Sequence, residues 1–496
     1  MISSYSISRQ LAVLAMMLAG QAAQAVSLSS QGTGQVLLYP LYKTFGGSVT
    51  QISVVNGEDR AKALRVQFNE ALNGRPVLTL NLYLGAHDTW YGSVFAASNQ
   101  GPANLVTDDA SCLFPDFRDN PAAPRLPDGR SYIPFDKSNY QDDGGFRDFS
   151  RTLDGTVTVF ELGSVLPGST LADALSVDPN GAGIAPKSCN YLAQAWANGV
   201  WTSNTSAGLV NPTGGLTGSA NLIDVAEGKL FAYDATALDD FRIDPLDSPQ
   251  GTKASVVMHT RPTDPHPTLA DAISDPVQQI ASADVTLRRH MIHVDYPASR
   301  AIDAVTATLM ADTIRNDYIF NYDDGITTDW IVAMPTARFY TDQDIVGPTA
   351  IPPFLLPFSN IPYHPSCLGI TSLAYFRNGE QNLGQIFNYE WCYSTQEISI
   401  SPPTEFSGSG FHGRHDYLLE QAGWQQWDLG GRTLLSNYKA SMRPANDGTI
   451  FDGLPVIGFA KFNFAAANAA GAAANYSGRS DHRRTVHCTN SAGKCD

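Results

Sequence analysis

The chain has 496 residues, of which 43% are hydrophobic and 16% charged, and its formal net charge is −16 at pH 7. The hydrophobic content excludes a disordered chain, and the low charge together with 42 Gly and 30 Pro argues against a coiled coil or helical solenoid. The negative balance argues against a nucleic acid partner, because contacts to phosphates need clustered Lys and Arg. The composition therefore indicates a large, acidic, turn-rich globular protein.

The first 25 residues have the pattern of an export signal. Arg9 is their one charged residue, an apolar run covers residues 11–20, and Ala23 and Ala25 form the small-x-small pattern that signal peptidases cleave. The apolar run is about half the length that a membrane anchor needs. We therefore expect a signal peptide at residues 1–25, no transmembrane segment after its removal, and an exported protein of the periplasm, cell surface or extracellular space.

Residues 26–150 predict a β-sandwich-like region that includes a long loop. Apolar and polar residues alternate in several short runs, and an Asn-Gly pair at residues 73–74 predicts a turn between two of them. The predicted strands cover residues 36–39, 51–55, 64–68, 78–84 and 90–95. Pro, Asp, Asn and Gly dominate residues 96–150, which predicts the long loop.

Residues 151–496 predict a second β-rich region, with an uncertain boundary to the first. Strands are predicted at residues 156–162 and 330–334, and helices at 190–198 and from 299 to about 315. Short strands separated by Gly, Asn and Pro are typical of sandwiches. We expect a mainly β fold: an antiparallel β-sandwich of immunoglobulin-like architecture with long loops and a few short helices.

The cysteines fit an oxidising compartment. Their number is even, and no CxxC or zinc-ligand spacing is present, so we expect three disulfides. Six cysteines allow fifteen pairings, of which the simplest joins neighbours in sequence. The candidate pairs are Cys112–Cys189, Cys367–Cys392 and Cys488–Cys495.

Several segments resemble a known family. They are residues 81–84 (NLYL), 88–90 (DTW), 225–228 (VAEG), 328–332 (TDWIV), 338–340 (RFY) and 453–459 (GLPVIGF). Together they resemble a family of uncharacterised secreted proteins of Gram-negative bacteria, over most of the chain. The resemblance implies a bacterial exported protein, and it provides neither an activity nor catalytic residues.

Metal binding is one possible chemistry of this sequence. His290 and His293 lie three residues apart, as do His412 and His415, and such pairs share a face when they lie on a helix. His482 and His487 lie in the basic segment 479–487. Acidic turns at residues 142–145 and 321–325 offer oxygen ligands for Ca²⁺, without the EF-hand spacing. We favour surface histidines and solvated turns, and we expect no other cofactor.

Catalytic signatures are weak. The turn at residues 407–410 (SGSG) lacks the spacing of a Gly-x-Ser-x-Gly nucleophile elbow. A glycosidase needs two carboxylates at a defined separation, and the sequence does not show which of its carboxylates meet. The candidates are Glu70, Glu161, Glu227, Glu390, Glu405 and Glu420. Trp424 and Trp427, like Trp196 and Trp201, can stack on sugar rings, but core positions are the preferred interpretation.

Two functional hypotheses follow. We favour an exported, non-enzymatic surface or periplasmic β-protein with a structural, adhesive or ligand-binding role, whose partner is a surface component or a saccharide. The alternative is a secreted hydrolase that acts on polysaccharide through a carboxylate pair. The sequence leaves open whether the protein is an enzyme.

Overall fold

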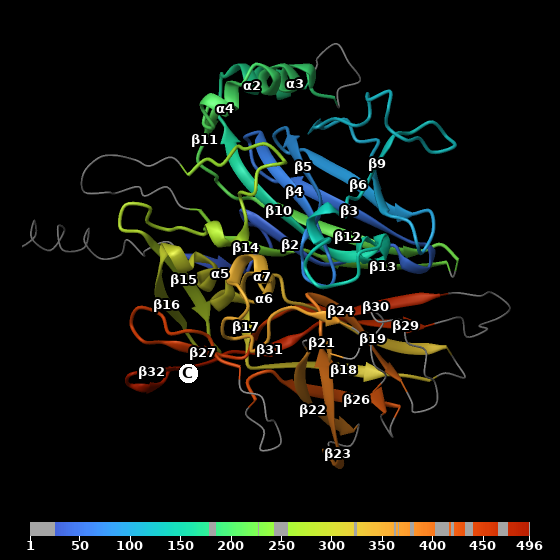
Figure 1. Cartoon of the computed structure of the whole chain (residues 1–496), viewed down its shortest axis with the longest axis vertical. Coiled ribbons are helices and arrows are strands. Elements are labelled where there is room, and N and C mark those ends of the chain that lie inside the picture. Colours follow the sequence, from blue (N-terminus) through green and yellow to red (C-terminus); the bar gives the residue numbers. More distant parts are fainter. Residues whose placement is uncertain are drawn as a thin grey trace, which may run out of the picture.

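The computed structural model describes residues 25–177, 185–226, 228–242, 256–321, 325–361, 364–365, 367–376, 381–401, 416–417, 421–431, 440–464 and 475–495, with the backbone alone for residues 360–361, 364–365, 376, 381–390, 401 and 416–417. Within these residues the chain forms several antiparallel sheets and a few short helices. Figure 1 shows two sandwiches of sheets, the N-terminal one above, drawn from blue to green except for its yellow strands β15 and β16, and the C-terminal one (yellow to red) below.

The larger sheet of the N-terminal sandwich is named sheet A. Its strand order is β16-β15-β1-β14-β2-β10-β4-β5-β8, with β11 paired to β10, and every pair is antiparallel except β1 with β15. The strands are β1 (Val26–Leu28), β2 (Val36–Lys43), β4 (Lys62–Glu70), β5 (Pro76–Leu84), β8 (Cys112–Phe114), β10 (Asp154–Val165), β11 (Leu209–Val210), β14 (Thr236–Asp239), β15 (Ile280–Thr286) and β16 (Met291–Pro297).

Sheet B completes this sandwich, with the strand order β13-β12-β3-β6-β7-β9. Its strands are β3 (Ser48–Asn56), β6 (Thr89–Ala96), β7 (Ala103–Val106), β9 (Tyr132–Pro134), β12 (Leu216–Asp224) and β13 (Lys229–Asp234). Sheets A and B pack face to face, because alternate apolar residues of each point to the same interior. Leu64 and Val66 of sheet A share a fully buried core with Val54 and Trp90 of sheet B.

The outer face of sheet A is covered as well, so β10 is buried along its whole length. Three helices pack beside β5 and β8: α2 (Thr170–Leu175), α3 (Asn190–Ala197) and α4 (Val200–Ser203). The Cys112–Cys189 disulfide ties β8 to the start of α3. Residues 256–271 cover the neighbouring part, where buried Arg65 of β4 donates hydrogen bonds to the carbonyl oxygens of Thr260 and Arg261.

Sheets C and D form the C-terminal sandwich, with strand orders β23-β22-β26-β18-β31 and β25-β24-β19-β29-β30. The strands are β18 (Thr313–Ile319), β19 (Ile326–Ala333), β22 (Leu368–Phe376), β23 (Gln381–Trp391), β24 (Thr395–Ser401), β25 (Asp416–Tyr417), β26 (Ala422–Asp428), β29 (Ile457–Phe464), β30 (Tyr476–Asp481) and β31 (Arg483–Thr485). Trp330 of sheet D and Trp427 of sheet C, both fully buried, meet in this core with ring centroids 4.4 Å apart.

Helix α5 (Ala301–Leu309) connects the sandwiches, because it packs on β1, β15 and β16 and leads directly toward β18. The remaining elements are η1 (Phe45–Gly47), η2 (Ser138–Tyr140), η3 (Phe149–Thr152), η4 (Leu269–Asp271), η5 (Ala298–Arg300), α6 (Arg338–Thr341), α7 (Gln343–Val346), β17 (Met310–Ala311), β20 (Asn360–Ile361), β21 (His364–Pro365), β27 (Ile450–Asp452), β28 (Leu454–Pro455), β32 (His487–Asn490) and β33 (Gly493–Lys494).

The two sandwiches meet along a seam with both apolar and polar contacts, and Phe459 of β29 packs there on Phe231 and Tyr233 of β13. Strand β13, at the edge of sheet B, lies beside β30, at the edge of sheet D (Figure 1). The Ser477 hydroxyl donates a hydrogen bond to the carbonyl oxygen of Leu230 across this junction. Elsewhere on the seam, Arg75 forms an ion pair with buried Asp342. These contacts fix the cavities that open between the sandwiches.

The expected fold class, mainly β with antiparallel sandwiches and a few short helices, is confirmed. The immunoglobulin-like detail is not confirmed by these strand orders and stays a prediction. The sequence predicts a boundary between two β-rich regions near residue 150. Strand β10 follows this position in the chain but pairs with β2 and β4, which precede it. Three disulfides are present and join the sequence neighbours named above, with Cys367–Cys392 at the base of the β22–β23 hairpin.

Two local expectations need correction. The helix predicted to reach about residue 315 ends at Leu309, because β-branched Thr313 and Ile314 pair with β26 instead. Residues 96–150, expected as a long loop, contain β7, β8, β9, η2 and η3. Their strands are only three or four residues long, so their alternation is too short to be recognised.

Candidate functional site

One cavity on the seam, named the Arg484 cleft, has a volume of about 260 Å³. It lies between the end of β13 and β14 in the N-terminal sandwich and β29–β31 in the C-terminal sandwich. Its lining residues are Leu28, Pro40, Asp234, Ala235, Thr236, Ile314, Val456, Ile457, Gly458, Phe459, Arg479, Asp481, His482 and Arg484. Half of the fourteen lining residues are apolar, and six are polar or charged.

The cleft forms where the chain passes from sheet D to sheet C. Strand β30 ends at Asp481, and after His482 the chain continues as β31, which pairs with β18. The wall beside this crossing is close to the backbone of β19. A Cβ at Gly458 would lie 2.0 Å from the carbonyl oxygen of Ile331, and Gly458 has φ of 145°. A residue with a side chain is therefore excluded at this position by both contact and conformation.

Arg479 spans the mouth of the cleft. Its Nη1 lies 2.9 Å from Asp234 Oδ2 of the N-terminal sandwich, and its Nε lies 2.9 Å from Asp481 Oδ1. Both carboxylates are largely exposed, so these ion pairs are screened by water. Arg479 is therefore shared by two aspartates, so the net charge at the mouth is negative.

Arg484 lies deeper in the cleft and has no such partners. Within the described chain its hydrogen bond goes from Nη2 to the carbonyl oxygen of Thr308, 3.1 Å away, and it forms no ion pair there. Burial lowers the pKa of Arg484 to about 10, which still leaves the guanidinium charged at neutral pH. A guanidinium has five N–H donors. Arg484 is therefore a half-buried cation with unused donors beside a cavity.

His482 is the titratable ring of the cleft, and both of its nitrogens are occupied. Nε2 donates to the carbonyl oxygen of Ile331 at 3.0 Å, and Nδ1 accepts from the Asn316 amide at 3.0 Å. The ring also packs on Trp330. Burial lowers the pKa of His482 to about 4, so the ring is neutral at pH 7. It shapes the wall and offers no free nitrogen for acid–base chemistry.

A second cavity on the seam, named the lysine hollow, has a volume of about 220 Å³. Its cations differ from Arg484 because they have carboxylate partners. Lys43 pairs with Glu397, and Lys461 lies 3.5 Å from Glu397 and 3.7 Å from Asp329. Burial acts to lower the pKa of Lys43, but Glu397 and Asp154 outweigh it and the pKa is raised. The lining residues are Lys43, Ser48, Leu222, Ile223, Asp224, Lys229, Phe231, Thr327, Lys461, Asn463 and Ser477.

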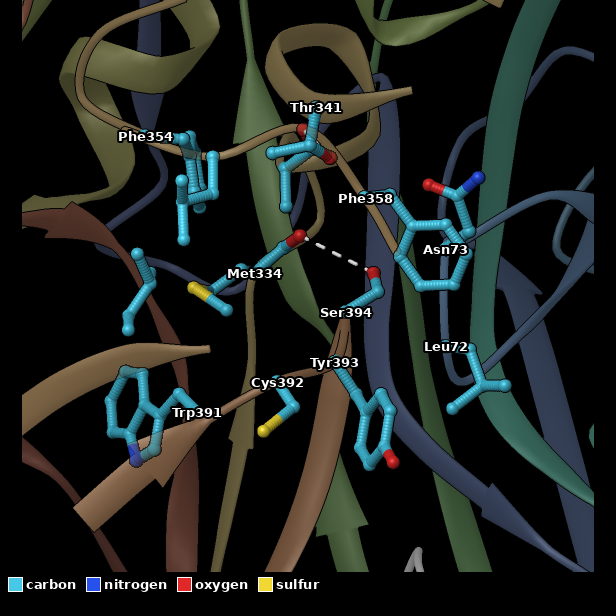
Figure 2. Close-up of a pocket in the computed structure, with 13 residues that line it drawn as sticks. Leu72, Asn73, Met334, Thr341, Phe354, Phe358, Trp391, Cys392, Tyr393 and Ser394 are labelled. Atoms are coloured by element: carbon cyan, nitrogen blue, oxygen red, sulfur yellow. Dashed lines mark hydrogen bonds between the residues drawn. The ribbon is translucent and has the colours of Figure 1, made fainter. Parts of the chain in front are cut away.

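Figure 2 shows a third cavity, beside the Cys367–Cys392 disulfide, whose lining is largely aromatic and aliphatic. Its volume is about 30 Å³, which is room for one or two water molecules. The side-chain oxygen of Asn73 is buried without a hydrogen-bond partner among the described residues, and Figure 2 places Asn73 at one end of this cavity. This space suits a bound water better than an organic ligand.

Of the described candidate histidines, His482 lines the Arg484 cleft, and the lining residues of the three cavities do not include the others. His290 and His293 lie on the exposed β15–β16 hairpin rather than on a helix, and His293 Nδ1 lies 2.7 Å from Asp284 Oδ1. His487 Nδ1 lies 2.8 Å from Asp452 Oδ2. No group of three or more potential ligands among the described residues has a metal-binding arrangement. His412 and His415 lie outside the described residues.

The candidate carboxylates are not brought together where they are described. Glu70 and Glu161 lie near opposite ends of the β4–β10 pair, since Glu70 faces Gly155 and Glu161 faces Leu64. Each is buried in an ion pair, with Arg151 and Lys62 respectively. The side chain of Glu390 is not described, and Glu227, Glu405 and Glu420 lie outside the described residues, as does the turn at residues 407–410.

The tryptophan pairs divide between core and surface. Trp196 of α3 and Trp201 of α4 are buried where these helices pack on sheet A, and Trp427 lies in the C-terminal core, as preferred from sequence. Trp424 is only partly buried and stacks on Tyr375 with ring centroids 4.0 Å apart. That stacking covers one face of the Trp424 ring, so the two rings do not form a flat platform for a sugar.

The acidic turns differ in what the structure shows. In the turn at residues 142–145, the Asp143 carboxylate already accepts from Arg151 and from Asn73. Residues 322–324 of the other turn lie outside the described part. A cation, Arg151, therefore occupies the position beside Asp143 that a metal would need.

Sequence reasoning missed Arg484 as a functional candidate. The signal was present, because the segment 479–487 is basic in a chain of net charge −16. However, Arg483 and Arg484 are adjacent on β31 and face opposite sides of sheet C. Only the tertiary structure shows which of them lines a cavity and which has a carboxylate nearby.

Comparisons with known proteins assign neither a family nor a function to the chain. No protein-family model matches the chain, and no curated protein matches it. In the part of the chain that the structure describes, the helices are too short or too polar to cross a bilayer.

Proposed function

We propose that this is an exported, non-enzymatic β-protein that binds a small ligand in the Arg484 cleft. The observation that carries the proposal is Arg484 itself, a charged guanidinium that lines a cavity of about 260 Å³ and has no carboxylate partner among the described residues. An apolar cavity with a few convergent polar groups is the usual form of a ligand site. A half-buried cation without a counter-charge is costly to a fold, and a ligand site explains its presence.

Export is supported by the signal-peptide pattern, the family resemblance and three disulfides. Full-length protein expressed in a Gram-negative host is expected to lose about 25 residues and to carry no reactive thiol. Cell fractionation, mass spectrometry and thiol alkylation test this. An uncleaved protein with free thiols in the cytoplasm would overturn the export part of the proposal.

The alternative, a polysaccharide hydrolase, stays a prediction with less support. Asp234 and Asp481 are the two carboxylates of the cleft, and both bind Arg479. The general acid of a glycosidase typically lies in an apolar pocket that raises its pKa, whereas both of these carboxylates are largely exposed. The arrangement at the mouth therefore fits binding better than glycoside hydrolysis.

Ligand binding is tested with an uncharged apolar probe. N-phenyl-1-naphthylamine is expected to bind the purified protein saturably, with a rise in fluorescence. Thr236→Trp places a large ring at the cleft wall and is expected to abolish this signal. Thr286→Trp, at an exposed position of β15, is the matched control and is expected to keep it. Equal probe binding in both variants would show that the cleft is not the site.

A further inference from the structure

The chemistry of the cleft narrows the class of ligand, on the premise that the proposed function is correct. Arg484 and Ile314 are directly opposed in the β18–β31 pair and both line the cavity. Their neighbours on β31 face the other side of the sheet. Arg483 lies near Asp317 at 3.6 Å, and the Thr485 hydroxyl is bonded to Thr313. Arg484 is thus the residue of β31 that presents charge to the cleft.

The geometry of a guanidinium selects the ligand's polar group. Its donors lie in one plane and match the two oxygens of a carboxylate, which a single point charge such as Lys does not do. One donor of Arg484 is fixed by the Thr308 carbonyl oxygen. The others remain available to an anion that enters the cleft.

The charge at the mouth limits how negative that anion is. Arg479 contributes one positive charge, and Asp234 and Asp481 contribute two negative charges. A dianion such as a phosphate monoester is repelled twice as strongly by this net charge as a monoanion. At the mouth itself, a ligand with a single negative charge therefore meets less repulsion than a dianion.

The lining of the cleft also restricts the chemistry of the uncharged part of the ligand. Leu28, Ala235 and Ile457 are the apolar lining residues that keep some exposed surface, whereas Ile314, Val456 and Phe459 are only 1–3% exposed. His482 adds an aromatic ring whose nitrogens are both used by the protein. The body of the ligand therefore meets hydrocarbon and ring surface, where apolar groups gain most from burial.

We propose that the Arg484 cleft binds a monocarboxylate with an apolar body, such as a medium-chain fatty acid, with the carboxylate on the Arg484 guanidinium. The apolar chain lies against Leu28, Ala235 and Ile457. Arg479 and its two aspartates stand at the entrance and disfavour more highly charged ligands.

The test uses decanoate below its micelle concentration, with decanol as the neutral analogue and decyl phosphate as the dianion. Isothermal titration calorimetry at pH 8 is expected to show that decanoate binds the wild-type protein more tightly than either analogue. Arg484→Gln is expected to weaken decanoate binding about tenfold or more, because a charged hydrogen-bond partner is lost. Arg484→Lys keeps the positive charge but loses the planar set of donors. Its affinity for decanoate is expected to lie between those of the wild-type protein and Arg484→Gln.

Arg483→Gln is the matched control, because Arg483 is the adjacent arginine on the opposite face of the sheet. It is expected to leave decanoate binding unchanged. If Arg484→Gln does not fold, the comparison of decanoate with decanol on wild-type protein still decides the point.

The outcomes separate this inference from the proposed function. If decanol binds as tightly as decanoate and Thr236→Trp abolishes both, the cleft binds ligands but the carboxylate assignment is wrong. Tightest binding of decyl phosphate would show that the site is made for a phosphate. If Thr236→Trp leaves all binding unchanged, both the inference and the proposed function fail.

Discussion

The Arg484 guanidinium donates a hydrogen bond to the carbonyl oxygen of Thr308, in the last turn of α5. The last carbonyls of a helix lack intrahelical partners and carry partial negative charge. Arg484 therefore caps a helix with one edge while its other donors face the cleft. This contact holds the side chain in place, so a ligand would meet a preorganised group.

Breaking a buried ion pair in sheet A is expected to be far more damaging than breaking an exposed one. Lys62 and Glu161 are both fully buried and their charged atoms are 2.9 Å apart. Lys62→Met leaves the Glu161 carboxylate buried without its cation, and we expect a loss of about 3–5 kcal/mol in the free energy of unfolding. Urea denaturation measures this value.

The matched control for that variant is Lys187→Met, which removes an exposed lysine from its pair with Asp173. Its expected cost is below about 1 kcal/mol. The double variant Lys62→Met/Glu161→Gln is expected to recover part of the single-variant loss. Equal effects of the two lysine substitutions would contradict the role given to the buried pair.

Two buried histidines are expected to make the protein less stable in mild acid. Burial, aided for His259 by nearby Arg65, lowers the pKa of His259 to about 3, and burial lowers that of His482 to about 4. An unfolded histidine has a pKa of about 6.5. Below that pH the unfolded chain binds protons that the folded chain does not, so stability falls as the pH falls.

The expected slope for each such histidine is up to about 1.4 kcal/mol per pH unit between pH 6 and pH 4.5. His259→Gln removes one of these groups and is expected to flatten the pH dependence of the unfolding free energy by that amount. His290→Gln, on the exposed hairpin, is the control. An unchanged slope in His259→Gln would mean that this ring is already protonated in the folded protein.

Asp240 is expected to have the opposite effect on the pH dependence of stability. Burial, together with Asp239 and Asp284, raises the pKa of its carboxyl group to about 6. The folded state therefore disfavours the ionised form, and this cost is present above pH 6 and disappears as the pH falls below about 4. Asp240→Asn is expected to stabilise the protein by about 1 kcal/mol at pH 8, a value reduced for partial solvent screening.

Asparagine also tolerates the positive φ of 48° at position 240. The gain is therefore expected to shrink steadily as the unfolding free energy is measured at lower pH. A gain that is the same at pH 4 and pH 8 would point to backbone preference rather than to charge.

The disulfides are expected to contribute unequally. The Cys112–Cys189 bond joins residues 77 positions apart, whereas Cys488–Cys495 joins residues seven apart. The entropy of loop closure predicts a loss of about 4 kcal/mol for the Cys112→Ala/Cys189→Ala variant and about 2 kcal/mol for Cys488→Ala/Cys495→Ala. Thermal and urea denaturation of both variants measure the difference, and a larger loss in the second variant would contradict this ranking.

The sequence was most informative where local pattern and tertiary environment agree. The alternation of Leu64, Val66 and Phe68 predicts a strand, and β4 contains all three. The same pattern gave no reason to expect that Arg65, between them, is buried as well. That follows from the cover that residues 256–271 place on the outer face of sheet A, which no local periodicity reveals.

The candidate site was less accessible to sequence reasoning. Histidine and carboxylate spacing drew attention to His290, His293 and Glu70, because motifs record which residues are close along the chain. The Arg484 cleft joins Leu28 and Pro40 to residues 234–236, Ile314, residues 456–459 and four residues between 479 and 484. What distinguishes Arg484 is the lack of a described carboxylate partner, and that depends on residues far apart in the sequence.

The strand order of sheet A restricts how this protein can be divided for study. Strands β15 and β16 complete the sheet beside β1, although they follow the rest of it by some 40 residues. A truncated product ending at residue 242 would lack β15 and β16. It would leave β1 as an exposed edge strand, and such edges favour aggregation. A soluble N-terminal fragment therefore has to extend at least to Leu309, so that α5 still covers β15.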